Sequence, residues 1–95
     1  MKTLGIGYIK GEIYDNVTQL TNTMQTIRAF VNSIRYEIKD KDEPNTDILE
    51  AYYQTIVRYR HRLDTNLAEL ELLIHMLRDA ELEYEQMQKQ VLHTP

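Results

Sequence analysis

The sequence predicts an all-α fold, an antiparallel two-helix hairpin that completes a four-helix bundle with a partner chain. Apolar residues recur at alternating spacings of three and four over most of the chain, as in a helix with one buried stripe. Three glycines and two prolines among 95 residues are too few for a turn-rich β fold. The only internal proline lies in a charged segment, residues 40–46, which divides the apolar pattern into two helices.

Length and charge limit the protein further. A chain of 95 residues is one domain, residues 1–95, since a second core would have too little chain to build on. Eleven Lys and Arg against fifteen Asp and Glu give a net charge of -4, which disfavours nucleic acid as a partner. The absence of cysteine excludes a disulfide framework and a thiolate nucleophile.

The N-terminal segment carries no recognisable export signal. Its apolar patch, residues 4–9, is interrupted by Lys10 and Glu12 before it reaches the length of a signal-peptide core. Mean hydropathy is -0.54, and no window is long and apolar enough for a membrane span. We expect a cytoplasmic protein, or one secreted without a cleaved signal peptide. Because apolar residues alternate with glycines here, we expect an extended start and a helix that begins between Tyr8 and Asp15.

The first helix is predicted over residues of about 10–39. Its apolar stripe keeps a heptad spacing through eight positions without interruption. The stripe comprises Ile13, Val17, Leu20, Met24, Ile27, Val31, Ile34 and Ile38. We therefore expect these eight side chains to face the second helix.

The turn is predicted at residues 40–46 and the second helix at about 47–92. Either Thr46 or Asp47 can cap this helix, and Asp47 with Glu50 resembles a capping box. The heptad stripe of the second helix has one polar member, Asn66. It comprises Leu49, Tyr52, Ile56, Tyr59, Leu63, Asn66, Leu70, Leu73, Leu77, Ala80, Tyr84, Met87 and Val91. Since the first helix is shorter, about a dozen residues of the second should project beyond it.

The apolar surface is wider than a lone hairpin can bury. Tyr53, Leu67 and Ile74 each follow a residue of the second stripe by one position, and Phe30 and Tyr14 flank the first stripe. A stripe widened in this way is typical of helices that pack against more than one neighbour. We therefore expect another helical chain to cover this surface.

No constellation indicates chemistry. His61, His75 and His93 are too far apart along one helix to share a metal ion, and two packed helices enclose no cleft for acid and base catalysis. We expect a protein that is not an enzyme and that uses no metal or other cofactor. Arg58, Arg60 and Arg62 form the densest basic run, which we interpret as a solvated face.

An uninterrupted acidic hairpin of this length, without cysteine and with a longer second helix, resembles the WXG-type proteins of bacterial type VII secretion. The likeness includes partners of LXG toxins. Ile6-Gly7-Tyr8 is similar to an element of some members, and Tyr84 occupies the place of the tyrosine in the secretion motif. Gln88 replaces the acidic residue of that motif, which implies that the partner supplies the export signal. Pro44-Asn45 gives a weaker likeness to type III secretion needle subunits and their chaperones.

These observations together predict a non-catalytic adaptor or chaperone that pairs with the helices of a secreted effector. The predicted partner-binding residues are Leu63, Leu67, Leu70, Ile74, Leu77, Tyr84, Met87 and Val91. Asn66 either fixes the register of the packing or marks a solvated gap. The alternatives are a homodimeric four-helix bundle that acts as a regulator or binds nucleic acid, and a subunit similar to type III secretion needle proteins or their chaperones.

Overall fold

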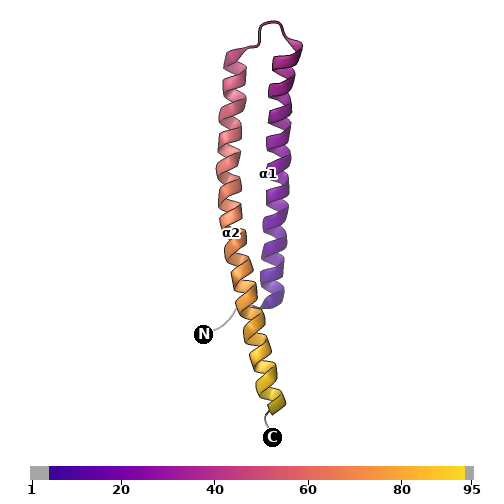
Figure 1. Ribbon diagram of the computed structural model, residues 1–95, viewed down its shortest axis with the longest axis vertical. Helices are drawn as coiled ribbons and strands as arrows, with labels where there is room; N and C mark the ends of the chain where they lie inside the picture. Colours follow the sequence, from indigo (N-terminus) through magenta and orange to yellow (C-terminus); the bar gives the residue numbers. More distant parts are fainter. Residues whose placement is uncertain (1–4, 94–95) are drawn as a thin grey trace.

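The computed structural model describes residues 5–93, with side chains described for residues 5–90. It contains two α-helices, α1 (Ile6–Asp40) and α2 (Thr46–His93). The helices lie side by side in opposite directions, joined by one short turn, in a rod of 82 × 20 × 13 Å (Figure 1). The antiparallel two-helix hairpin is confirmed. Since the rod is about one helix diameter thick, the second layer of a four-helix bundle would have to come from another chain.

Phe30 defines the register of the two helices. Its ring centroid lies 5.8 Å from that of Tyr52 and 6.3 Å from that of Tyr59. Phe30 is therefore level with the middle of the α2 segment between these two tyrosines. Both helices rise by about 1.5 Å per residue, so a step toward the start of α1 matches a step toward the end of α2. The start of α1 is therefore level with Ala80, and the last turns of α2 project beyond it (Figure 1).

The side of α2 that packs on α1 follows the predicted stripe up to Ala80. Leu73, Ala80 and Asn66 are buried, and the other stripe residues from Leu49 to Leu77 are partly buried. Every described side chain from residue 81 to residue 90 is exposed, because α1 does not extend that far. We call this projecting end of α2, residues 81–93, the overhang.

The packing side of α1 differs from the prediction at every second position. Ile13, Leu20, Ile27 and Ile34 face α2 as expected, but Val17, Met24, Val31 and Ile38 are exposed. The side chains that pack on α2 instead precede each of these exposed residues by one position. The buried or partly buried stripe of α1 is Ile9, Ile13, Asn16, Leu20, Thr23, Ile27, Phe30, Ile34 and Glu37. The helix is thus rotated relative to the predicted orientation.

Two contacts explain this rotation. The Phe30 ring packs between Tyr52 and Tyr59, where aromatic pairing adds to the burial of area. The Glu37 carboxylate reaches the start of α2, where Oε1 accepts a hydrogen bond from the backbone N–H of Asn45 at 3.0 Å. Both contacts require the column of residues that precedes Val31 and Ile38 to face α2. The heptad spacing alone fits either orientation, because Ile13, Leu20, Ile27 and Ile34 belong to both stripes.

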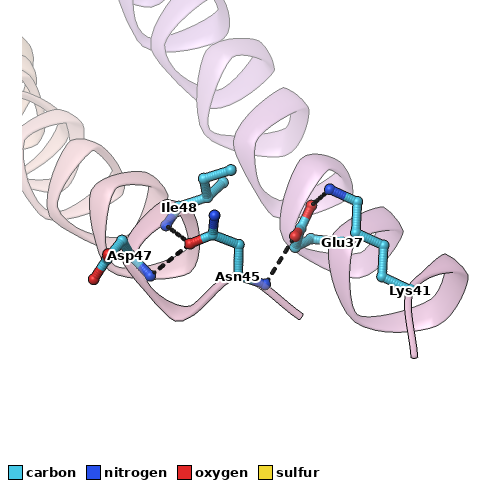
Figure 2. Close-up of polar contacts among 5 residues, drawn as sticks. All are labelled: Glu37, Lys41, Asn45, Asp47 and Ile48. Carbon is cyan, nitrogen blue, oxygen red and sulfur yellow. Dashed lines mark hydrogen bonds and ion pairs between the residues drawn. The ribbon is translucent and has the colours of Figure 1, made fainter. Parts of the chain in front are cut away.

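Asn45 caps α2, and the predicted cap at Thr46 or Asp47 is wrong. The Asn45 side-chain Oδ1 accepts hydrogen bonds from the backbone N–H groups of Asp47 at 3.0 Å and Ile48 at 3.2 Å (Figure 2). These donors have no partner within the helix, so an asparagine cap stabilises its first turn. Thr46 is the first helical residue, and the Asp47 carboxylate lies where the helix dipole favours negative charge.

The Glu37 carboxylate joins the two helices at the turn. Besides the bond from Asn45, its Oε2 lies 3.0 Å from the Lys41 ammonium (Figure 2). The hydrogen bond from the Asn45 backbone, followed by that from Lys41, lowers the pKa of Glu37 below its ordinary value of 4.5. The carboxylate is therefore held in its charged form, although Glu37 is among the buried residues.

α1 begins at Ile6, earlier than the expected start between Tyr8 and Asp15. Gly5 is the N-cap and offers no side-chain cap, so packing stabilises this end. Ile9 is only 1% exposed, the most buried side chain of the described residues. The extended start expected for Ile6 to Tyr8 is wrong, because Ile6, Ile9 and Ile13 have helical spacing and pack against α2. Leu4 lies outside the described residues.

Candidate interaction surface

The first half of the candidate surface is a row of exposed apolar side chains on α1. Val17, Met24, Val31 and Ile38 recur every seven residues and are between 41% and 56% exposed. Each follows a residue of the packed stripe by one position. Sequence reasoning placed these four side chains against α2 and did not identify them as surface. The sequence carried no signal for this orientation, because the column that packs on α2 in their place contains Asn16, Thr23 and Glu37, and polar side chains cost free energy when they are buried without partners.

The second half is the corresponding row on α2. Tyr53, Leu67 and Ile74 are 56%, 49% and 45% exposed and also follow a residue of the packed stripe by one position. Arg60 occupies the same column between Tyr53 and Leu67. A long side chain there can lay its methylene groups along the apolar surface while its guanidinium stays in water. The row is apolar over most of its length.

Both rows lie on the same face of the hairpin. Each row is rotated in the same sense from the packed stripe of its helix, since each follows that stripe by one residue. The two helices are right-handed and run in opposite directions, so the same rotation about each axis leads to the same side of the pair. We call this surface the apolar face; it comprises Val17, Met24, Val31, Ile38, Tyr53, Leu67 and Ile74.

The predicted partner-binding residues divide between three places. Leu67 and Ile74 lie exposed on the apolar face. Leu63, Leu70 and Leu77 are partly buried against α1, so they stabilise the hairpin itself, and any direct contact with a partner by them stays a prediction. Tyr84 and Met87 lie exposed on the overhang, at 53% and 59%, away from α1. Val91 lies in α2 but outside the residues whose side chains the structure describes.

Asn66, the predicted register residue, is one of two buried asparagines between the helices. Asn66 and Asn16 are 6% and 4% exposed, and the register places them in neighbouring layers of the packing. The amide nitrogens of both, and the Oδ1 of Asn16, make no hydrogen bond. Unpaired amides cost free energy when buried, so these two layers weaken the contact between α1 and α2.

The opposite face of the hairpin carries part of the basic run. Thr55, Arg58, Tyr59 and Arg62 line a shallow hollow on α2, and the Arg62 guanidinium lies 5.2 Å from the centre of the Tyr59 ring. Arg58 and Arg62 thus share one side of the helix, whereas Arg60 lies in the column of the apolar face. The three arginines of the run therefore do not form a single patch.

Two polar groups of the overhang are joined by a hydrogen bond. Gln88 donates it from its Nε2 to the Tyr84 hydroxyl at 2.9 Å. The two side chains are exposed on the same side of α2.

In the part of the chain that the structure describes, neither helix contains a segment long and apolar enough to cross a membrane. Within the same residues, no three side chains of the kinds that bind metal ions come together.

The fold and this surface define an extended helical hairpin with an exposed apolar face, a class of protein suited to binding other helices. No protein-family model, curated protein or solved structure matches the chain. The surface itself therefore provides the basis for a functional proposal.

Proposed function

We propose that this chain is a non-catalytic, protein-binding hairpin, an adaptor or chaperone that pairs with the helices of a secreted effector. The observation that carries the proposal is the apolar face, where seven apolar side chains from two helices are exposed on one side. Contiguous exposed apolar surface of this kind marks interaction sites in soluble proteins. An amphipathic partner helix would lie along the apolar face, in contact with both α1 and α2, and bury its own apolar stripe there.

The overhang extends the proposed contact. Tyr84 and Met87 lie exposed on it, in the same heptad columns that face α1 further up the helix. A partner helix that continued beyond the start of α1 would take the place of α1 beside these residues. The secretion role is favoured by the resemblance to WXG-type proteins and to the partners of LXG toxins. The replacement of the acidic motif residue by Gln88 favours an export signal on the effector.

Co-expression with the N-terminal helices of a candidate effector tests this function. The expected result is a 1:1 complex in size-exclusion chromatography with light scattering, weakened at least tenfold by Leu67→Asp. A charge buried at the centre of a helix interface is costly, whereas Leu67 is half exposed in the hairpin, so the fold should tolerate the change. Leu72→Asp is the matched control, because Leu72 is 59% exposed but lies outside the apolar face. Equal binding by both variants would refute the proposed surface.

A further inference from the structure

We propose that, when no effector is bound, a second copy of this chain covers the apolar face in a face-to-face four-helix bundle whose two turns lie at the same end. This inference rests on the proposed function, since it concerns the same surface, and it names the occupant of that surface in the purified protein. The area of the face, its symmetry and the charges along its edges all favour this arrangement.

The area of the apolar face matches what a stable dimer buries. The face runs from Ile38, near the turn, to Ile74 on α2. The register places Ile74 level with a point of α1 about 26 residues before Ile38, so the face is about 40 Å long at 1.5 Å per residue. The rod is 20 Å wide. A second hairpin laid over this length and width would therefore have a footprint of about 800 Å² on each copy, or about 1,600 Å² in total, the usual size of a specific interface.

Each hairpin contributes one apolar row from α1 and one from α2, so the face can pair with itself through a two-fold axis. Two such axes bring the faces together. An axis parallel to the rod places α1 over α2 of the other copy and both turns at the same end. An axis across the rod places α1 over α1 and α2 over α2, with the turns at opposite ends.

The charges at the outer edges of the face favour the first arrangement. The edge of α1, at every seventh residue from Tyr14 to Arg35, carries Arg28 and Arg35 and no acidic residue. The edge of α2, at every seventh residue from Glu50 to Arg78, is mainly acidic; its charged residues are Glu50, Asp64, Glu71 and Arg78. All of these side chains are exposed. An arrangement with α1 over α2 therefore places a basic edge beside a mainly acidic one at both sides of the interface.

Arg35 and Glu50 form the best-matched pair. The register defined by Phe30 places the two residues at nearly the same height along the rod. With the turns at the same end, Arg35 of each copy lies beside Glu50 of the other. With the turns at opposite ends, the acidic edge of α2 faces the same edge of the second α2, and Asp64 and Glu71 lie near like charges. Like charges across an interface are unfavourable, so the same-end arrangement is selected.

Sedimentation of the purified 95-residue chain at micromolar concentration tests the dimer. The expected result is a dimer that Met24→Asp converts to a monomer with unchanged helicity, while Leu72→Asp remains dimeric. A monomeric wild-type chain, or a dimer that Met24→Asp does not affect, overturns the inference. A monomer that still binds effector helices would leave the proposed function intact, and a dimer that binds no effector would leave the inference intact.

The orientation has its own measurement. The chain contains no cysteine, so Asp42→Cys places a single spin label on the exposed turn of each copy. Turns at the same end predict a label separation comparable to the 20 Å width of the rod. Turns at opposite ends predict a separation of about 50 Å, the length of α1 at 1.5 Å per residue, and would overturn the arrangement. Arg35→Glu and Glu50→Arg should each weaken the dimer about two- to five-fold, and the double exchange should restore it.

Discussion

The Glu37 carboxylate accepts a hydrogen bond at 3.0 Å from the backbone N–H of Asn45, the residue whose own side chain caps α2. The end of one helix is thereby bonded to the start of the next. Lys41 contributes an ion pair to the same carboxylate, one helical turn further along the chain. This arrangement makes the closure of the hairpin depend on one ionised group.

Glu37 should make the stability of the hairpin sensitive to acid. Its pKa is lowered in the folded state, so its contribution is present above the ordinary value of 4.5 and is lost as the pH falls through the lower folded value. Glu37→Gln should therefore be less stable than the wild type at pH 7. The difference between the two should narrow below pH 4.5, as urea denaturation at several pH values can measure. A difference that stays constant with pH would contradict the role of the charge.

Asn45→Ala should lower the free energy of unfolding by about 1 kcal/mol, because it removes the side-chain acceptor for two backbone N–H groups at the start of α2. Thr46→Ala is the matched control, since Thr46 is an exposed first residue of the helix. Chemical denaturation followed by circular dichroism compares the two. A larger loss of unfolding free energy for Thr46→Ala than for Asn45→Ala would show that Asn45 is not the cap of α2.

Asn16→Leu should raise the free energy of unfolding by about 1–3 kcal/mol, because both polar atoms of this buried amide lack a hydrogen-bond partner. Leucine has a similar size and would pack in the same layer. Asn22→Leu, at an exposed position outside the apolar face, should leave the stability nearly unchanged. The midpoints of thermal unfolding measure both effects. Destabilisation by Asn16→Leu would show that the amide makes a favourable contact.

Phe30→Ala should destabilise the hairpin by about 3 kcal/mol, because the ring packs against Tyr52 and Tyr59 and defines the register. Tyr36→Ala removes an aromatic ring that is 69% exposed on the same helix and should have little effect. Urea denaturation with tyrosine fluorescence follows both variants. Equal losses would indicate that the aromatic contact does not hold the helices together.

The overhang should exchange its amide hydrogens faster than the rest of α2. Its described side chains are exposed and α1 does not lie beside it, and isolated helices of this length are marginal in water. Hydrogen exchange followed by mass spectrometry should show low protection for residues 81–93 and high protection around Leu73. Protection of the overhang should rise when an effector helix binds, and uniform protection in the free chain would argue against an unpaired end.

Much of the fold follows from the sequence alone. The period of the apolar residues determined two helices, the charged segment around Pro44 determined the turn, and the single heptad stripe of α2 determined which side faces α1 as far as Ala80. The extra apolar residues at Tyr53, Leu67 and Ile74 indicated a second surface. These features depend on local spacing and on turn chemistry, both of which can be read along the chain.

Only the tertiary structure decided the rotation of α1, and with it the composition of the apolar face. The stripe through Val31 and the stripe through Phe30 share every other residue, so their periods are equal and spacing cannot choose between them. The choice comes from contacts between residues far apart in the sequence: Phe30 with Tyr52 and Tyr59, and Glu37 with Asn45. These contacts bury a partly polar column and leave Val17, Met24, Val31 and Ile38 exposed beside the exposed row of α2.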